Sequence, residues 1–282
     1  QSQNRSWNLS GSLTKSLSGG FSAKGGFNYG VSRSLVEPSS TAGSSWGSAN
    51  PIVRDPNNPD LAYSANSPGK RVFAQVNYTK QYLKLGATTI SLFWDAHTNG
   101  NTSYVFSGDA NGDSVSGNDL IYIPRSQSEM NFVTFTANNR TYTAAEQAAA
   151  FDQYIAADPY LSKHRGEYAE RGAVFLPVLQ RVDLSLTQDV FKALGGRRHS
   201  GQIRLDVVNF GNMLNKNWGV GKRLVNSQIL TSPTADATGA LSYRMQLNSG
   251  NYITSPYQSS SNFTSTNSDV YVMMLSFRYT FN

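Results

Sequence analysis

Apolar and polar side chains alternate over an unusual length at the carboxy-terminal end of the chain. Between residues 271 and 281 every odd position is apolar or aromatic, whereas the even positions after Met274 are polar. The odd positions hold Tyr271, Met273, Leu275, Phe277, Tyr279 and Phe281. A period of two is typical of a β-strand with two different faces. Because the stretch from Ser268 to Asn282 exceeds the ~9–11 residues that a membrane-crossing strand needs, it predicts a strand that spans a bilayer.

The same alternation recurs in six further segments. They are residues 7–14, 21–32, 71–79, 89–95, 181–190 and 202–207. Charged side chains in them, such as Arg181 and Asp206, fall on the polar face. This placement is expected for a strand in a membrane, since a charge turned toward lipid costs several kcal/mol. We therefore predict an all-β fold, a transmembrane antiparallel β-barrel whose polar face lines a wet lumen. The alternative is a soluble sandwich, in which the apolar faces of two sheets meet in a dry core.

The composition agrees with a wall that has one face in lipid and one in water. Only 15% of the residues are charged, below the ~25% usual for soluble domains, and 12% are aromatic. The mean hydropathy of −0.41 and the lack of a run of ~20 apolar residues exclude a transmembrane helix. The chain has no cysteine, which excludes disulfides, thiolate metal sites and cysteine nucleophiles.

The residue pattern also bears on the class of function. No nucleophile with an adjacent base and no pair of carboxylates stands out, so we expect no enzymatic activity. The three histidines, His97, His164 and His199, lack metal-ligand spacing. The net charge of +6 is not gathered into a basic block interleaved with aromatics, so we expect no nucleic-acid partner.

The lengths of the links between the predicted strands predict an orientation. Outer-membrane barrels have short periplasmic turns and long extracellular loops. The links at 18–20, 81–86 and 192–200 are short, whereas those at 34–69, 97–177 and 216–267 are long. We therefore expect the long links outside the cell, the carboxy terminus in the periplasm, and outer-membrane lipid and lipopolysaccharide around the apolar face.

Seven strands cannot close a bacterial single-chain barrel, because such barrels use an even number of strands. Open edges in hydrocarbon would leave backbone groups unpaired at several kcal/mol each. We therefore expect a further chain, or sequence upstream of Gln1, to supply the rest of the wall, with Gln1 as a cut or break in an outer loop.

Several segments resemble TonB-dependent outer-membrane receptors, most closely the Oar-like group whose amino end carries a carboxypeptidase-regulatory-like domain. GDANGD at 108–113 with GNDLIYIP at 117–124 resembles an outer-loop motif of that family. DPYLSKHRGEYAER at 158–171, RVDLSL at 181–186 and DVVNFGNMLN at 206–215 resemble its late barrel segments. FRYTFN at 277–282 is similar to its closing strand. The resemblance covers most of residues 70–282.

The resemblance implies a barrel of about 22 strands that is occluded by an amino-terminal plug. Residues 1–282 would then be the carboxy-terminal portion of one barrel domain, with its last seven strands, and the plug and amino-terminal domains would be absent from this chain. The implied partners are the rest of the barrel, the plug, TonB acting through that plug, and a surface lipoprotein. The implied function is energised transport of a large or scarce ligand. A passive porin, or a structural or export barrel that anchors surface proteins, stays as an alternative.

Oxygen-bearing side chains recur at alternate positions in one of the long links. Asp109, Asn111 and Asp113, followed by Asn118 and Asp119, resemble a Ca²⁺-binding loop. Ser114 stands where an EF-hand loop has glycine, Leu120 stands where it has a bidentate carboxylate, and Asp119 comes one position early. We predict a calcium site formed by Asp109, Asn111, Asp113 and Asp119, with an ordinary Asx-rich turn as the alternative. No other cofactor is expected.

The long links contain two further features. Thr143 and Glu146 form a capping-box pattern that predicts a short helix up to Asp158, with a lid-like packing role. Aromatic side chains are the candidate ligand contacts, by stacking on sugars or peptide side chains: Tyr104, Tyr142, Tyr243, Tyr252, Tyr257 and Phe263. The alternative for these aromatics is packing of one loop on another.

Overall fold

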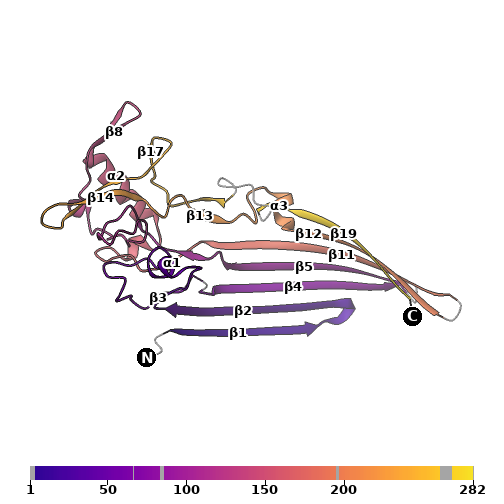
Figure 1. Ribbon diagram of the computed structural model, residues 1–282. Helices are drawn as coiled ribbons and strands as arrows, with labels where there is room; N and C mark the ends of the chain where they lie inside the picture. Colours follow the sequence, from indigo (N-terminus) through magenta and orange to yellow (C-terminus); the bar gives the residue numbers. More distant parts are fainter. Residues whose placement is uncertain (1–3, 66, 83–85, 195–196, 261–268, 282) are drawn as a thin grey trace.

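Seven long strands form one antiparallel sheet whose spatial order follows the sequence (Figure 1). The computed structural model describes residues 4–65, 67–82, 86–194, 197–260 and 269–281. The strands are β1 (Arg5–Ser16), β2 (Phe21–Ser34), β4 (Gly69–Tyr82), β5 (Gly86–Thr98), β11 (Val178–Leu194), β12 (Arg197–Val208) and β19 (Val272–Phe281). The short β3 (Ala62–Tyr63) pairs with the end of β2. The predicted all-β class is confirmed, and each of the seven segments predicted to alternate corresponds to one of these strands, whereas the closed barrel and its strand count stay predictions.

The strand register sorts apolar and polar residues onto opposite faces. One row across five strands consists of Tyr78, Ile90, Leu186, Leu205 and Leu275. The adjacent row, one residue along each strand, consists of Thr79, Thr89, Thr187, Arg204 and Ser276. Because neighbouring residues of a strand point to opposite faces, these two rows lie on different sides of the sheet. A slip of one residue between any two strands would mix the faces.

The apolar face of the sheet is open to the surroundings. Leu13, Leu275 and Phe277 are 74–76% exposed, and many other large apolar side chains of this face are more than 40% exposed. The soluble-sandwich alternative needs a second large sheet to cover them. In the described part of the chain, the remaining sheets have only two or three strands. The sandwich core is therefore not formed by these residues.

The polar face lines a hollow of about 580 Å³ and carries pairs of opposite charges. Arg71 Nε donates to Asp95 across β4 and β5 at 2.6 Å, and Arg204 Nε lies 2.8 Å from a carboxylate oxygen of Asp206. Phe73 and Phe93 depart from the predicted pattern, since both lie on this polar side, with ring centroids 6.2 Å apart. The face is thus polar with one aromatic patch.

Short and long connections lie at opposite ends of the sheet (Figure 1). The turn η1 (Ser18–Gly20) joins β1 to β2 at one end, and its Gly19 and Gly20 have φ of 72° and 87°, which favours glycine. The predicted links at 81–86 and 192–200 fall partly outside the described residues. The described parts of residues 35–68, 99–177 and 209–271 lie at the other end. Which end faces outside the cell stays a prediction.

These three long connections, in their described residues, pack into one unit, here called the loop assembly (Figure 1). Its helices are α1 (Ala42–Trp46), α2 (Ala144–Ala157) and α3 (Phe210–Leu214), with 3₁₀ turns η2 (Gln127–Glu129) and η3 (Leu161–Lys163). Its short strands are β6 (Asn101–Thr102), β7 (Phe106–Ser107), β8 (Phe135–Ala137), β9 (Arg140–Tyr142), β10 (Val174–Phe175), β13 (Lys222–Leu224), β14 (Leu230–Ala235), β15 (Leu241–Met245), β16 (Leu247–Asn248), β17 (Asn251–Tyr252) and β18 (Tyr257–Ser259).

The hydrophobic core lies in the loop assembly, not in the long sheet. The buried apolar cluster is drawn from residues 104–174 and 224–253, and its fully buried members include Ile121, Ile123, Phe151 and Ile229. The loop assembly therefore has the interior of a small globular domain, whereas the long sheet carries its apolar side chains on the outside.

Helix α2 begins at the predicted capping box. The Thr143 side chain accepts a hydrogen bond from the backbone of Glu146, and the Glu146 carboxylate accepts one from the backbone of Thr143. The helix buries Phe151, Tyr154 and Ile155 in the core of the loop assembly. The predicted helix is confirmed, and its role as a lid stays a prediction. No helix in the described residues is long and apolar enough to cross a membrane.

Replacing the capping residue tests the local stability of this helix. We expect Thr143→Ala to destabilise α2 by about 1 kcal/mol, because the backbone N–H of Glu146 loses the Thr143 side-chain oxygen that accepts its hydrogen bond. Hydrogen exchange of the α2 amides should be about five times faster than in the wild type. Thr141→Ala, at an exposed position of β9, is the matched control and should leave α2 unchanged. Equal α2 exchange in wild type and Thr143→Ala would show that the box does not stabilise the helix.

Candidate functional site

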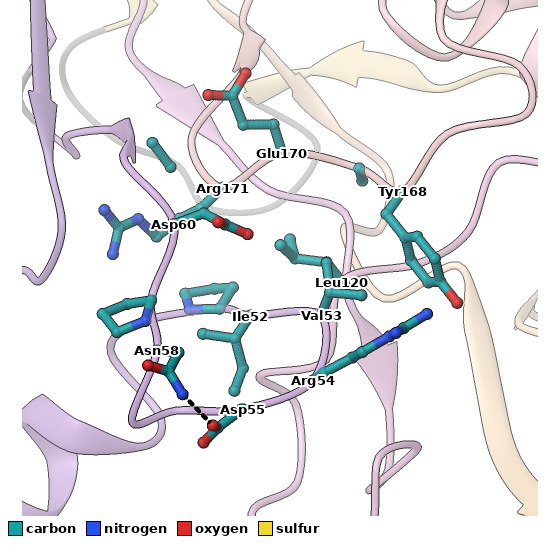
Figure 2. Close-up of a pocket in the computed structure, with 14 residues that line it drawn as sticks. Ile52, Val53, Arg54, Asp55, Asn58, Asp60, Leu120, Tyr168, Glu170 and Arg171 are labelled. Carbon is teal, nitrogen blue, oxygen red and sulfur yellow. Dashed lines mark hydrogen bonds between the residues drawn. The ribbon is translucent and has the colours of Figure 1, made fainter.

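One pocket of the loop assembly lies between residues 51–62, Leu120 and residues 168–171 (Figure 2). Its volume is about 530 Å³, within the size range of small-molecule sites. It is lined by Pro51, Ile52, Val53, Arg54, Asp55, Asn58, Pro59, Asp60, Ala62, Leu120, Tyr168, Ala169, Glu170 and Arg171. The first and second long connections thus meet in this pocket.

The pocket combines an apolar floor with charged groups around it. Ile52, Val53 and Leu120 form the floor, and Figure 2 shows Arg54 extended in the direction of Tyr168. Tyr168 is 46% exposed, so its ring is open to a ligand. An apolar surface with a few convergent polar groups is the usual composition of a ligand site.

Two carboxylates of the pocket interact with neighbouring side chains or backbone groups. Asp55 accepts hydrogen bonds from Asn57 and Asn58, which lower the pKa of its carboxyl (Figure 2). Burial raises the pKa of Glu170, while the Arg33 guanidinium, 3.0 Å away, acts in the opposite direction. At neutral pH these carboxylates favour a ligand that carries a cationic or hydrogen-bond-donating group.

Arg171 anchors one wall of the pocket to the first long connection. It is 5% exposed, and Nη1 donates to the Leu35 carbonyl at 2.9 Å and to Asn50 Oδ1 at 2.7 Å. Nη2 donates to the backbone carbonyl of Ser34. Burial lowers the pKa of this guanidinium. These bonds join parts of the chain that are more than 120 residues apart, which makes Arg171 a positioning residue of the pocket.

The structure places the predicted aromatic contacts mostly in the interior of the loop assembly. Tyr104, Tyr142 and Tyr243 are at most 9% exposed, and their rings pack against other residues of the loop assembly. The Tyr104 hydroxyl donates to Asp158 at 2.8 Å, and burial raises the pKa of the Tyr104 hydroxyl. The Tyr142 hydroxyl donates to the Gly250 carbonyl at 2.7 Å. For these three tyrosines, packing of loop on loop is the role that the geometry supports.

The other predicted aromatic contacts are less enclosed. Tyr252 is half-buried, with its hydroxyl 3.4 Å from Glu146, and burial raises its pKa to about 12. Tyr257 is half-buried near Asp158. Phe263 lies outside the described residues. None of the five predicted tyrosines lines the pocket of Figure 2, where Tyr168, within the segment 158–171, supplies the exposed ring.

The predicted calcium loop is folded by its own side chains. Asp109 accepts backbone N–H groups from Gly112 at 2.7 Å and Ser114 at 2.9 Å, and Asp113 accepts that of Val115 at 2.8 Å. These bonds are those of the predicted Asx-rich turn. They do not exclude a cation, because a carboxylate oxygen has more than one lone pair.

Asn118 and Asp119 form hydrogen bonds to the loop and are almost fully buried. Asp119 Oδ2 accepts the N–H of Ala110 at 2.6 Å, whereas Asp119 Oδ1 and Asn118 Oδ1 have no hydrogen-bond partner. Burial raises the pKa of Asp119 to about 6, and the carboxylates of Asp113 and Asp109 contribute in the same direction. Among the described residues, no group of three or more His, Cys, Asp and Glu side chains is already placed to hold a metal ion.

Comparison with known proteins identifies no relative. No family model, no curated protein and no solved structure matches this chain. The functional argument therefore depends on the geometry of the sheet and of the loop assembly, and the family resemblance stays a prediction.

Proposed function

We propose that this chain is the carboxy-terminal part of an outer-membrane β-barrel that transports a large or scarce ligand in a TonB-dependent manner. The observation that carries this proposal is the continuous band of exposed apolar side chains on one face of the long sheet. Burying one such side chain is worth about 1.5–3 kcal/mol, so a face that leaves many of them open suits a hydrocarbon environment. The opposite face, with its paired charges, suits an aqueous lumen.

The dimensions of the strands support a membrane position. β5 has 13 residues, which at about 3.4 Å per residue and a tilt of about 40° rise roughly 30 Å. This height covers the apolar band of about 25 Å that outer-membrane barrels present to lipid. The end strands β1 and β19 each pair on one side only within the described chain, so further strands would complete the wall.

In this proposal the loop assembly is the ligand-facing part of the transporter. The pocket of Figure 2 would receive the ligand, and the hollow polar face would contact the plug on which TonB acts. A surface lipoprotein would dock on the loop assembly. The chemistry of the pocket suits a ligand with an apolar part and polar groups at its ends.

Transport by the full-length protein in its native host tests the proposal. We expect uptake of labelled peptide or oligosaccharide mixtures to require both this protein and TonB. The double variant Arg54→Ala, Tyr168→Ala should lower uptake at limiting ligand at least tenfold, because both pocket side chains are lost. Asp236→Ala, in an exposed turn of the loop assembly, is the control. Uptake that persists without TonB, together with steady conductance in planar bilayers, would identify a passive porin instead.

A further inference from the structure

The 109–119 loop concentrates negative charge without a compensating cation. Asp109, Asp113 and Asp119 lie within this short segment, at most ten residues apart in the sequence. In the described part of the chain, none of the three forms an ion pair with lysine, arginine or histidine. Mutual repulsion of these carboxylates is thus unrelieved by protein groups.

Two buried acceptor oxygens at the base of the loop also lack a donor. Asn118 is 0% exposed and Asp119 is 2% exposed, yet Asn118 Oδ1 and Asp119 Oδ1 accept no hydrogen bond. Both side chains are directed to the loop, since Asn118 Nδ2 donates to Asp113 at 3.2 Å and Asp119 Oδ2 accepts from Ala110. A buried polar atom without a partner costs about 1–3 kcal/mol, and more for a charged group. A bound cation would satisfy both oxygens at once.

We propose that this loop binds one Ca²⁺ ion through oxygen atoms of Asp109, Asn111, Asp113, Asn118 and Asp119. Ca²⁺ takes six to eight oxygen ligands in flexible geometry, so carboxylate, amide and backbone oxygens can be combined. The first three ligands follow the spacing of an EF-hand loop, and Ser114 has a left-handed φ of 69° where that loop makes its sharp glycine turn.

The ion would join two long connections of the loop assembly. The Ile52 N–H donates to the Asn118 carbonyl at 2.8 Å, and the Leu120 N–H donates to the Ile52 carbonyl at 2.8 Å. Asn111 Nδ2 donates to the carbonyl of Arg54 at 3.3 Å. Because Ile52, Arg54 and Leu120 line the pocket of Figure 2, Ca²⁺ would also order the floor of that pocket.

Calcium titration of the full-length protein, purified in detergent and treated with chelator, tests the site. We expect one Ca²⁺ per chain with a Kd of about 10⁻⁴–10⁻³ M, the range of extracellular calcium modules, and at least tenfold weaker binding of Mg²⁺. Ca²⁺ should slow hydrogen exchange at residues 50–54 and 109–120. Asp119→Asn should weaken binding at least tenfold and abolish this protection, because one carboxylate charge is lost.

Two matched variants make the result decisive. Asp236→Asn changes an aspartate that accepts N–H groups in another exposed turn, and it should bind Ca²⁺ as the wild type does. Asp113→Asn is the second site variant should Asp119→Asn fail to fold, and it should also lose binding. The proposal is overturned if the wild type binds no Ca²⁺ at 10 mM, a concentration about tenfold above the expected Kd range, if Mg²⁺ binds equally well, or if the site variants bind normally. None of these readouts depends on transport.

Discussion

Leu92→Arg is expected to destabilise the protein in a lipid bilayer by about 2–4 kcal/mol. Leu92 lies in the middle of β5, between Val76 and Leu184 in the register, and is 44% exposed. On a water-facing surface, replacing a side chain of this exposure changes stability by less than about 0.5 kcal/mol. In hydrocarbon the guanidinium would lose its hydration, so the same substitution discriminates between the two environments.

The matched control for this substitution is Ser91→Arg, one residue earlier on the same strand. Ser91 lies on the polar face and lines the hollow there. Asp183, Asp189 and Asp206 line the same hollow. An arginine there has acidic neighbours and water, so we expect a change below about 1 kcal/mol. Folding of the full-length protein into vesicles, followed along a urea series, measures both variants. Equal effects of Leu92→Arg and Ser91→Arg would contradict a lipid-facing apolar face.

Arg171→Ala is expected to cost the loop assembly about 3–5 kcal/mol of local stability. The guanidinium donates to Leu35, Asn50 and Ser34, and each hydrogen bond to a charged group contributes about 1.5–3 kcal/mol. Removing it takes one donor from each of these acceptors, of which Asn50 Oδ1 keeps the N–H of Glu37 at 2.6 Å. Part of the loss is offset because a buried charge is removed as well. Arg171→Lys should lose about half as much, since an ammonium keeps the charge but not the planar fork.

Hydrogen exchange and limited proteolysis of residues 33–50 and 168–174 measure this effect. The control is Arg125→Ala, which removes an exposed i,i+4 pair with Glu129 at 2.9 Å and should change stability by less than about 0.5 kcal/mol. If Arg171→Ala has no larger effect than Arg125→Ala, the first long connection is not held to the second by this residue.

The long strands could be predicted from sequence because their two faces meet different surroundings. Because every second residue of a strand lies on the same face, apolar and polar residues alternate in the sequence. Leu184, Leu186 and Val190 alternate in this way with Ser185 and Thr187. Phe73 and Phe93 broke the pattern because they contact each other on the polar side, where the cations of Lys24 and Arg71 lie over the Phe73 ring. Helix α2 was predictable for a similar reason, since its capping box lies within four residues.

The arrangement of the loop assembly could not be predicted in the same way. Its contacts join residues far apart in sequence, such as Arg171 with Ser34 and Tyr104 with Asp158, and no local pattern marks them. An aromatic residue in a long link is equally suited to packing or to ligand contact by its chemistry. Burial separates the two roles, and it placed Tyr104 and Tyr142 inside and Tyr168 at a pocket.

The most direct test of the central claim is a spin-label accessibility scan along β5. The chain has no cysteine, so single cysteines at positions 89–94 can be labelled one at a time in the full-length protein in bilayers. We predict an alternation with a period of two, in which labels at 90, 92 and 94 meet lipid-dissolved oxygen and those at 89, 91 and 93 meet a water-soluble nickel reagent. Equal access of the nickel reagent to all six positions would contradict a sheet with one face in lipid.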